Sequence, residues 1–284
     1  MKKNKQWQII TITHFWACLF VLTIGSFGGY IEAQNNSGLF EESDAKMRAK
    51  MVGVARNSVG ISMGINLPDN EFASIYDDEL GGYANNGFVF SVDGNYLLLR
   101  NIGLAASFSM YSNNINNNAY LKTSLQRLPN GSEGSLTATK WRNSLVAVGP
   151  CISLPEKKVV FDLRLLLGLV HTASPEFHFE GSYEGNSIVE IRNKVTTVSP
   201  VFVFGGMLAY PLSTANLYNW SIFTKAEIIA ASPNIKVGYT VQSDNYSVTS
   251  IHQYEQIVGT FALAIGFRHE FGYANNKNWN NVFK

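Results

Sequence analysis

Residues 256–271 constrain the fold of this chain more than any other stretch. Residue type alternates along them with a period of two, as it does along a β-strand. One face carries Ile257, Phe261, Leu263, Ile265, Phe267 and Phe271, and the other carries Thr260, Ala262, Ala264, Gly266, Arg268 and Glu270. Large apolar side chains opposite small or charged ones suit a barrel wall between lipid and a polar interior. Strands of soluble sandwiches also alternate, so this interpretation depends on whether the pattern recurs.

The alternation does recur, in seven earlier segments. These are residues 58–67, 87–99, 102–111, 141–154, 158–172, 197–210 and 219–232. Short turns follow the second, fourth and sixth segments, and long loops follow the others, at 68–86, 112–140, 173–196 and 233–255. Bacterial outer-membrane barrels have an even number of strands, short periplasmic turns and long external loops. We therefore predict an all-β fold, a transmembrane antiparallel up-and-down β-barrel of eight strands over residues 57–271.

Composition and the N-terminus agree with a secreted membrane protein. Charged residues make up 15% of the 284 residues, against about 25% in a typical soluble domain. The net charge of +1, without a long basic run, argues against binding of nucleic acid. Lys2, Lys3 and Lys5 precede an apolar stretch that leads to Ala33, which predicts a cleaved signal peptide at 1–33. An uncleaved membrane anchor is the alternative. Residues 34–56 are then a periplasmic segment, and residues 272–284 a C-terminal tail.

With these features the chain resembles the small outer-membrane β-barrel proteins of Gram-negative bacteria, the porin-like group. The resemblance covers about residues 57–271 and includes the final-strand assembly signal, which Gly266 and Phe271 match. His269 and Ala264 depart from that signal, at positions where an aromatic and a polar residue are usual. The resemblance implies location in the cell outer membrane, contact with outer-membrane lipid, and insertion by the barrel insertion machinery. We expect a monomer.

Seven charged residues fall on the face that we assign to the barrel interior. They are Asp93, Asp162, Arg164, Lys225, Glu227, Arg268 and Glu270. The interior of an eight-stranded barrel is only wide enough for side chains to fill it. Because unpaired charges there would be costly, we predict a paired polar network that plugs the lumen. A narrow ion or solute path lined by the same residues is the alternative.

Aromatic residues near the strand ends predict an interfacial girdle at the membrane surface, and the candidates are Tyr96, Trp141, Tyr210 and Trp220. A carbohydrate-stacking site is the other interpretation of the same residues. The external loops 112–140 and 233–255 are rich in Asn, Ser and Tyr, a composition suited to contact with an extracellular ligand or partner.

Catalytic signals are weak. His171, Ser174 and Glu176 lie close in sequence, but their spacing does not place all three on one face of a strand. His178 and Glu180 share a face within an expected loop. We predict no catalytic residue, no metal site and no cofactor. The function expected is a non-enzymatic structural or surface-interaction barrel, with a porin-like passive channel as the alternative and a lipid-modifying enzyme after that.

Overall fold

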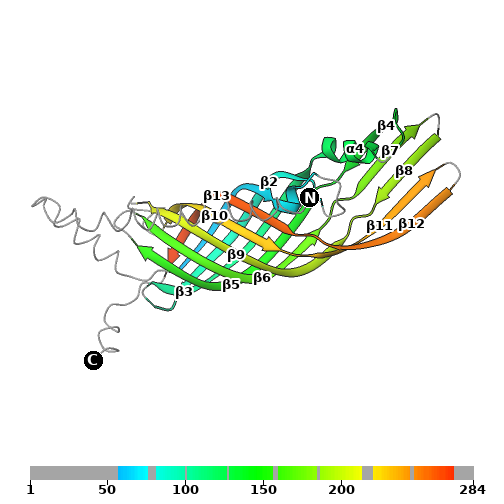
Figure 1. Cartoon of the computed structure of the whole chain (residues 1–284). Coiled ribbons are helices and arrows are strands. Elements are labelled where there is room, and N and C mark those ends of the chain that lie inside the picture. Colours follow the sequence, from blue (N-terminus) through cyan, green and yellow to red (C-terminus); the bar gives the residue numbers. More distant parts are fainter. Residues whose placement is uncertain are drawn as a thin grey trace, which may run out of the picture. The chain divides into compact units, whose positions relative to one another are not determined.

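Eight antiparallel strands form a closed barrel in the computed structural model, which describes residues 57–75, 81–99, 101–126, 128–155, 159–183, 186–212, 220–243 and 246–271. The strands are β1 (Asn57–Asp69), β2 (Ala84–Leu97), β3 (Ile102–Ile115), β5 (Trp141–Pro155), β6 (Val160–Ala173), β9 (Thr196–Pro211), β10 (Trp220–Ala231) and β13 (Val258–Phe271). Their order around the wall is β1-β13-β10-β9-β6-β5-β3-β2 (Figure 1). Each of the eight predicted segments coincides with one of these strands, so the predicted fold is confirmed.

Pairing of the first barrel strand with the last closes the wall. Asn57 lies opposite Phe271, and the register runs without a shift to Asp69 opposite Gly259. The predicted signal peptide at 1–33, the segment 34–56 and the tail 272–284 lie outside the described residues. The strand ends that flank the short connections, from β2 to β3, from β5 to β6 and from β9 to β10, lie at the same barrel end as Asn57 and Phe271. By the usual arrangement of such barrels this end is periplasmic.

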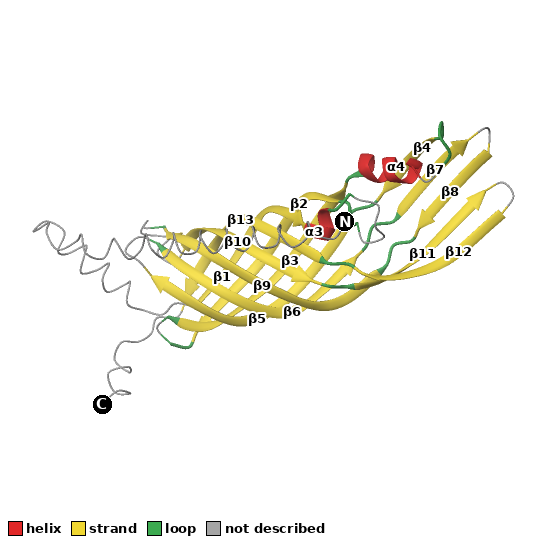
Figure 2. Ribbon diagram, in the orientation of Figure 1, coloured by secondary structure: helices red, strands yellow, loops and turns green. Residues whose placement is uncertain are grey.

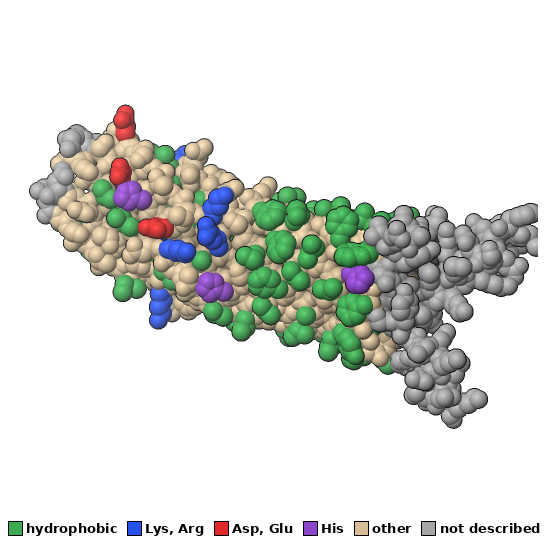
Figure 3. Space-filling view, turned by 180° about the vertical axis from the view of Figure 1, so that it is seen from behind, with side chains coloured by type: hydrophobic (Ala, Val, Ile, Leu, Met, Phe, Trp, Pro, Cys, Tyr) green, Lys and Arg blue, Asp and Glu red, His purple; other side chains and the backbone are tan. Residues whose placement is uncertain are grey.

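The outer surface of the wall is apolar, as a lipid-facing surface must be. Side chains such as Ile61, Leu167 and Ile265 are each more than half exposed. Figure 3 shows hydrophobic side chains gathered around the barrel part of the molecule. Lipid provides no hydrogen-bond partners, and a closed sheet satisfies every backbone group of the wall internally. An apolar exterior around a polar interior makes this chain a β-barrel of the outer membrane.

A second sheet extends five of the barrel strands beyond the barrel end opposite the short connections. It contains β4 (Glu133–Ala138), β7 (Phe177–Tyr183), β8 (Asn186–Arg192), β11 (Asn234–Ser243) and β12 (Tyr246–Glu255), in the order β12-β11-β8-β7-β4. We call it the outer sheet. Two residues separate β10 from β11, and two separate β12 from β13, so the hairpins of the barrel continue into it (Figure 1). The prediction of plain loops at 112–140, 173–196 and 233–255 was therefore wrong.

Strand β12 of the outer sheet escaped prediction because it lacks an apolar face. In β12 nearly every residue is exposed, on both faces, and such a strand shows little apolar alternation. One signal was available: the pairs Tyr183–Asn186 and Ser243–Tyr246 are each separated by two residues, the length of a tight hairpin turn. Those intervening residues, Glu184-Gly185 and Asp244-Asn245, are residue types common in turns.

Within the residues that the structure describes, two short helices accompany the strands (Figure 2). Helix α3 (Asn70–Ala73) follows β1 and contacts β13, β1 and β2, so it lies at the outer mouth of the barrel. Helix α4 (Asn117–Gln126) follows β3 and packs on β4 and β7 of the outer sheet. Within the described parts of the chain, neither helix nor any other has the length and hydropathy needed to cross a membrane.

Candidate functional site

The charged residues predicted for the lumen do lie inside the barrel, and all seven are at most 4% exposed. Four of them form one cluster. Arg164 Nη1 lies 2.8 Å from Asp93 Oδ1, and Arg164 Nη2 contacts Glu227 Oε1. Lys225 Nζ lies 2.9 Å from Asp93 Oδ2 and 3.1 Å from Glu227 Oε2. Two cations and two anions alternate in this arrangement, so their formal charges cancel.

The cluster spans the lumen from one side of the wall to the other. Asp93 belongs to β2, Arg164 to β6 and Lys225 to β10, and two strands separate β2 from each of the others around the barrel. The hydroxyl of Ser107 on β3 also donates to Asp93 Oδ1 at 2.8 Å. These side chains reach across the barrel interior and pair with one another, and a plug of the lumen stays a prediction.

Gly205 on β9 allows the ion pair between Arg164 and Glu227. It lies between them in register, paired with Arg164 on β6 and with Glu227 on β10. A Cβ atom at position 205 would come within 2.6 Å of Glu227 Cγ. The two side chains meet across β9 because this position has no side chain.

The remaining three charges form a second cluster, with Arg268 at its centre. Arg268 Nη1 lies 2.6 Å from Asp162 Oδ2, and Arg268 Nη2 lies 3.0 Å from Glu270 Oε1. Neutral donors complete it, since Asn95 Nδ2 donates to Asp162 at 3.2 Å and Ser221 Oγ donates to Glu270 at 2.9 Å. A small pocket beside Arg268 is lined also by Ser58, Asp93 and Asn95.

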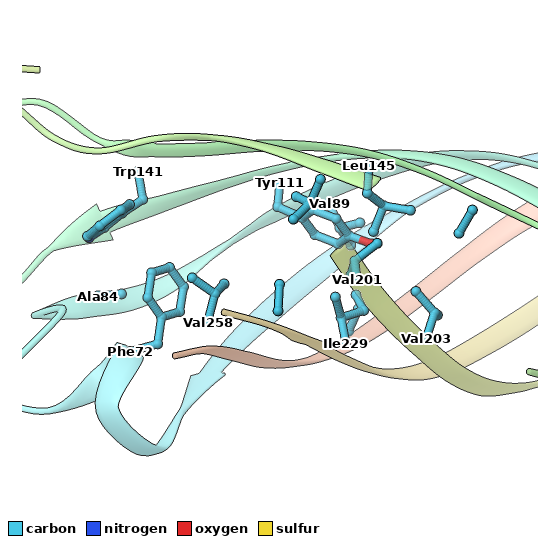
Figure 4. Packing of buried hydrophobic residues seen from close by; sticks show 14 of the residues in the cluster. Phe72, Ala84, Val89, Tyr111, Trp141, Leu145, Val201, Val203, Ile229 and Val258 are labelled. Atoms are coloured by element: carbon cyan, nitrogen blue, oxygen red, sulfur yellow. The ribbon is translucent and has the colours of Figure 1, made fainter. Parts of the chain in front are cut away.

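An apolar cap fills the lumen at its outer end (Figure 4). Phe72 of α3 and Trp141 of β5 are 0% and 1% exposed, and their rings meet edge to face with centroids 5.3 Å apart. The indole Nε1 of Trp141 donates to the carbonyl oxygen of Gly82 at 2.8 Å. Val258, Tyr111 and Leu145 belong to the same buried cluster. The cap and the two ionic clusters thus lie at different levels inside the barrel.

Trp141 corrects the predicted girdle, because its side chain points into the barrel and not toward lipid. Trp141 is an odd-numbered residue of β5, so it lies on the same face of the strand as Asn143 and Leu145, which are also buried. The other three candidates, Tyr96, Tyr210 and Trp220, are 59%, 56% and 40% exposed on the outer wall. They lie beside the short turns at the periplasmic end, where a girdle is expected.

Gly266 and Phe271, the residues of the predicted assembly signal, lie on opposite faces of β13. Gly266 faces the lumen, and Phe223 of β10 lies over it, since a Cβ at position 266 would come within 2.8 Å of Phe223 Cζ. Phe271 is 47% exposed at the periplasmic end of the strand. Packing of Phe223 is a structural reason for glycine at 266, and recognition by the insertion machinery stays a prediction.

One arginine of the outer sheet lies among aromatic rings, with no salt bridge to the residues that the structure describes. Arg192 ends β8 and is 6% exposed. Its Cζ lies 5.3 Å from the ring centroid of Phe177, 5.5 Å from that of Tyr239 and 5.3 Å from that of Tyr254. Its Nε and the hydroxyl of Tyr254 are both buried without a hydrogen-bond partner among the described residues. Sequence reasoning missed this cluster because it treated the region as loop.

The weak catalytic candidates do not form a catalytic constellation. Ser174 is buried, and its hydroxyl accepts a hydrogen bond from the backbone N–H of Val195 at 3.0 Å. His171 is exposed on the outer wall of β6. His178 and Glu180 pair at 2.9 Å on the exposed face of β7. In the described residues no group of three or more His, Cys, Asp or Glu side chains is placed to hold a metal ion.

No protein-family model and no curated protein matches this chain. Among solved structures it is similar to Ail, the attachment invasion locus protein of Yersinia pestis, with 17% identity over 76% of this chain and 98% of that one, at a TM-score of 0.34. Neisserial surface protein A has 11% identity over 77% and 99%, with a TM-score of 0.35. The outer-membrane protease OmpT of Escherichia coli has 13% identity over 76% and 97%, with a TM-score of 0.33.

Proposed function

We propose that this chain is a non-enzymatic outer-membrane barrel that makes contacts at the cell surface through its outer sheet. The observation that carries the proposal is the continuation of the barrel hairpins into five ordered strands outside the membrane region. A barrel that served only as a membrane anchor would need no more than short connections there. Ordered strands hold exposed side chains in fixed positions, which favours specific contact.

The filled lumen supports a sealed barrel over a passive channel. Ion pairs bridge the lumen from β2 to β6 and β10, and such a bridge favours a closed path at that level. The cap of Phe72 and Trp141 adds an apolar barrier at the outer mouth. An ion that entered would meet both obstacles, and displacement of paired buried charges is costly.

The first test is electrical. Purified protein whose barrel is verified by heat-dependent gel mobility is inserted into a planar lipid bilayer. We expect no discrete conductance steps. Regular steps whose selectivity changes in Arg164→Ala would establish the porin-like alternative and contradict a sealed barrel.

The second test concerns the outer sheet. In one variant, short Gly-Ser turns replace residues 177–192 and 234–255, and the barrel strands are unchanged. Bacteria displaying the intact chain are expected to adhere to at least one surface coated with acidic polysaccharide, neutral polysaccharide or protein. The shortened variant should fold, as judged by gel mobility, and should not adhere. Equal adhesion by both forms, or by neither, would rule out a contact role for the sheet.

The same preparations test the enzyme hypothesis. Incubation of folded protein with phospholipid or lipid A should release no fatty acid. Release that disappears in His171→Ala would instead establish a lipid hydrolase.

A further inference from the structure

The outer sheet has an inner face that continues the interior of the barrel. Along β10 and β11 the odd-numbered residues Ile229, Ala231, Ile235 and Val237 are all buried on this side. Arg192 lies on the same face, because it pairs in register with Tyr239 of β11 and with Phe177 of β7. The arginine therefore points toward the outer mouth of the barrel and not toward lipid.

The arginines of the lumen contact carboxylates, whereas the contacts found for Arg192 among the described residues are with aromatic rings. Its Nε is buried without a hydrogen-bond partner among the described residues. Three aromatic rings compensate part of the cost of burying the charge, because a cation over a ring face is attracted to it. An arginine carries five N–H donors, and the rings accept none of them in the way an oxygen does.

A second polar group in the same cluster also lacks a hydrogen-bond partner. The hydroxyl of Tyr254 is buried without a partner, and the Tyr254 ring lies 5.3 Å from Arg192 Cζ. Buried polar groups are nearly always hydrogen-bonded, so two of them without protein partners in one cluster indicate a shared external acceptor. An oxyanion provides acceptors for both.

We propose that Arg192, with Tyr254, binds a carboxylate group of an extracellular ligand at the outer mouth of the barrel. The planar guanidinium fork matches a carboxylate in a bidentate geometry. Phe177, Tyr239 and Tyr254 hold the guanidinium plane in place, so little side-chain freedom is lost on binding. Helix α4 contributes support, because Tyr120 stacks on Phe177 with ring centroids 4.3 Å apart.

A single positive charge favours a monoanion. Glu190 lies two residues before Arg192 on the same face of β8, and this second carboxylate disfavours ligands of higher negative charge. The ligand class is accordingly a carboxylate-bearing molecule, such as an acidic sugar, in preference to a phosphate or sulfate dianion. This inference rests on the proposed contact function of the outer sheet and names the chemistry of one contact.

The test uses the folded full chain in detergent micelles and titrates it with sodium glucuronate, with glucose and inorganic sulfate as comparison ligands. Calorimetry or protein-observed NMR reports binding. Glucuronate is expected to bind saturably, with a Kd of about 1 mM, as suits one charged contact on a small ligand. Glucose should not bind. Sulfate that binds more tightly than glucuronate would overturn the assignment to a carboxylate.

Variants locate the site. Arg192→Met should lower the affinity for glucuronate at least about tenfold, and Arg192→Lys should also weaken it because lysine lacks the bidentate fork. Tyr254→Phe should weaken binding a few-fold while it preserves the ring. Arg142→Met, on the exposed outer wall of β5, is the control and should bind as the unchanged chain does. Each variant is first checked for folding by gel mobility, and Tyr254→Phe carries the test if Arg192→Met fails that check.

Undiminished glucuronate binding by both Arg192→Met and Tyr254→Phe, or no binding by the unchanged chain, would overturn the proposal. The proposed function has a separate outcome. If adhesion still depends on the outer sheet while glucuronate does not bind, the contact function stands and the Arg192 site is wrong.

Discussion

Two buried arginines in different regions of this molecule have opposite surroundings. Arg164, in the lumen, is 2% exposed and contacts Asp93 and Glu227. Arg192, in the outer sheet, is 6% exposed and contacts three aromatic rings but no carboxylate. Both are enclosed by protein, so exposure does not distinguish them. Their partners do.

The difference shows how the two regions serve different ends. In the lumen the charges are matched to one another, as stability of a closed interior requires. In the outer sheet a charge is held without a protein partner, and such a group is able to bind something from outside. Buried charges that pair with one another indicate a structural role, and a buried charge among aromatic rings is available to bind an anion from outside.

The largest effect is expected from Arg164→Met. It leaves Asp93 and Glu227 with Lys225 as their remaining cation in the cluster, and loss of one partner from a buried network costs about 3–5 kcal/mol. Equilibrium urea unfolding in lipid vesicles measures it. Arg142→Met, exposed on the wall, is the matched control and should change the unfolding free energy by less than about 0.5 kcal/mol. Equal small effects of both would remove the structural role that we assign to the lumen network.

The next largest loss of unfolding free energy is expected from Gly205→Val. The added Cβ meets Glu227 Cγ, so the ion pair over β9 must move, and overpacking of this kind costs about 1–3 kcal/mol. Gly206→Val provides the comparison at the adjacent position, where the nearest atom to an added Cβ is 3.4 Å away, on the ring of Phe161. The same unfolding measurement should show a clearly smaller loss at 206. The reverse order would mean that the lumen does not require the short side chain at 205.

Trp141→Phe should cost about 1–2 kcal/mol. The change removes the hydrogen bond to Gly82 while it keeps an aromatic ring in the cap, and the carbonyl oxygen of Gly82 is left without that donor. Trp220→Phe, on the exposed wall, is the control and should be close to neutral. A cost at Trp220 as large as that at Trp141 would contradict the different placement of the two residues.

The smallest effect on stability is expected from Arg192→Met, within about 1 kcal/mol of zero. Methionine replaces an unpaired buried charge with an apolar side chain of similar length, and the lost cation–π contacts offset the removed desolvation cost. A loss of several kcal/mol, like that expected for Arg164→Met, would show that the two arginines play the same structural role and would break the comparison.

Much of the barrel could be predicted from the sequence because its physics is local. A wall between lipid and a polar interior requires alternation in every strand, and residues such as Leu163, Leu165 and Leu167 on β6 display it directly. The same alternation assigned Asp93, Arg164 and Glu227 to the interior. The outer sheet could not be found in this way, since water on both sides of β12 imposes no apolar face.

Trp141 shows why even a correct strand can mislead. The boundaries of β5 were predicted closely, and aromatics near strand ends are common at membrane surfaces. Whether the first residue of the strand faces in or out depends on where the register begins, and the pairing of Trp141 with Asn113 on β3 fixes it.

The sequence by itself determined that strands alternate, that their number is even, and which charges face inward, because these properties follow from the medium on each side of the wall. Only the tertiary structure decided which charges pair, that Phe72 and Trp141 close the outer mouth, and that Arg192 lies among rings. Those contacts join residues from strands far apart in the chain. Their partners depend on how the barrel closes and how its hairpins extend, and no local pattern encodes that arrangement.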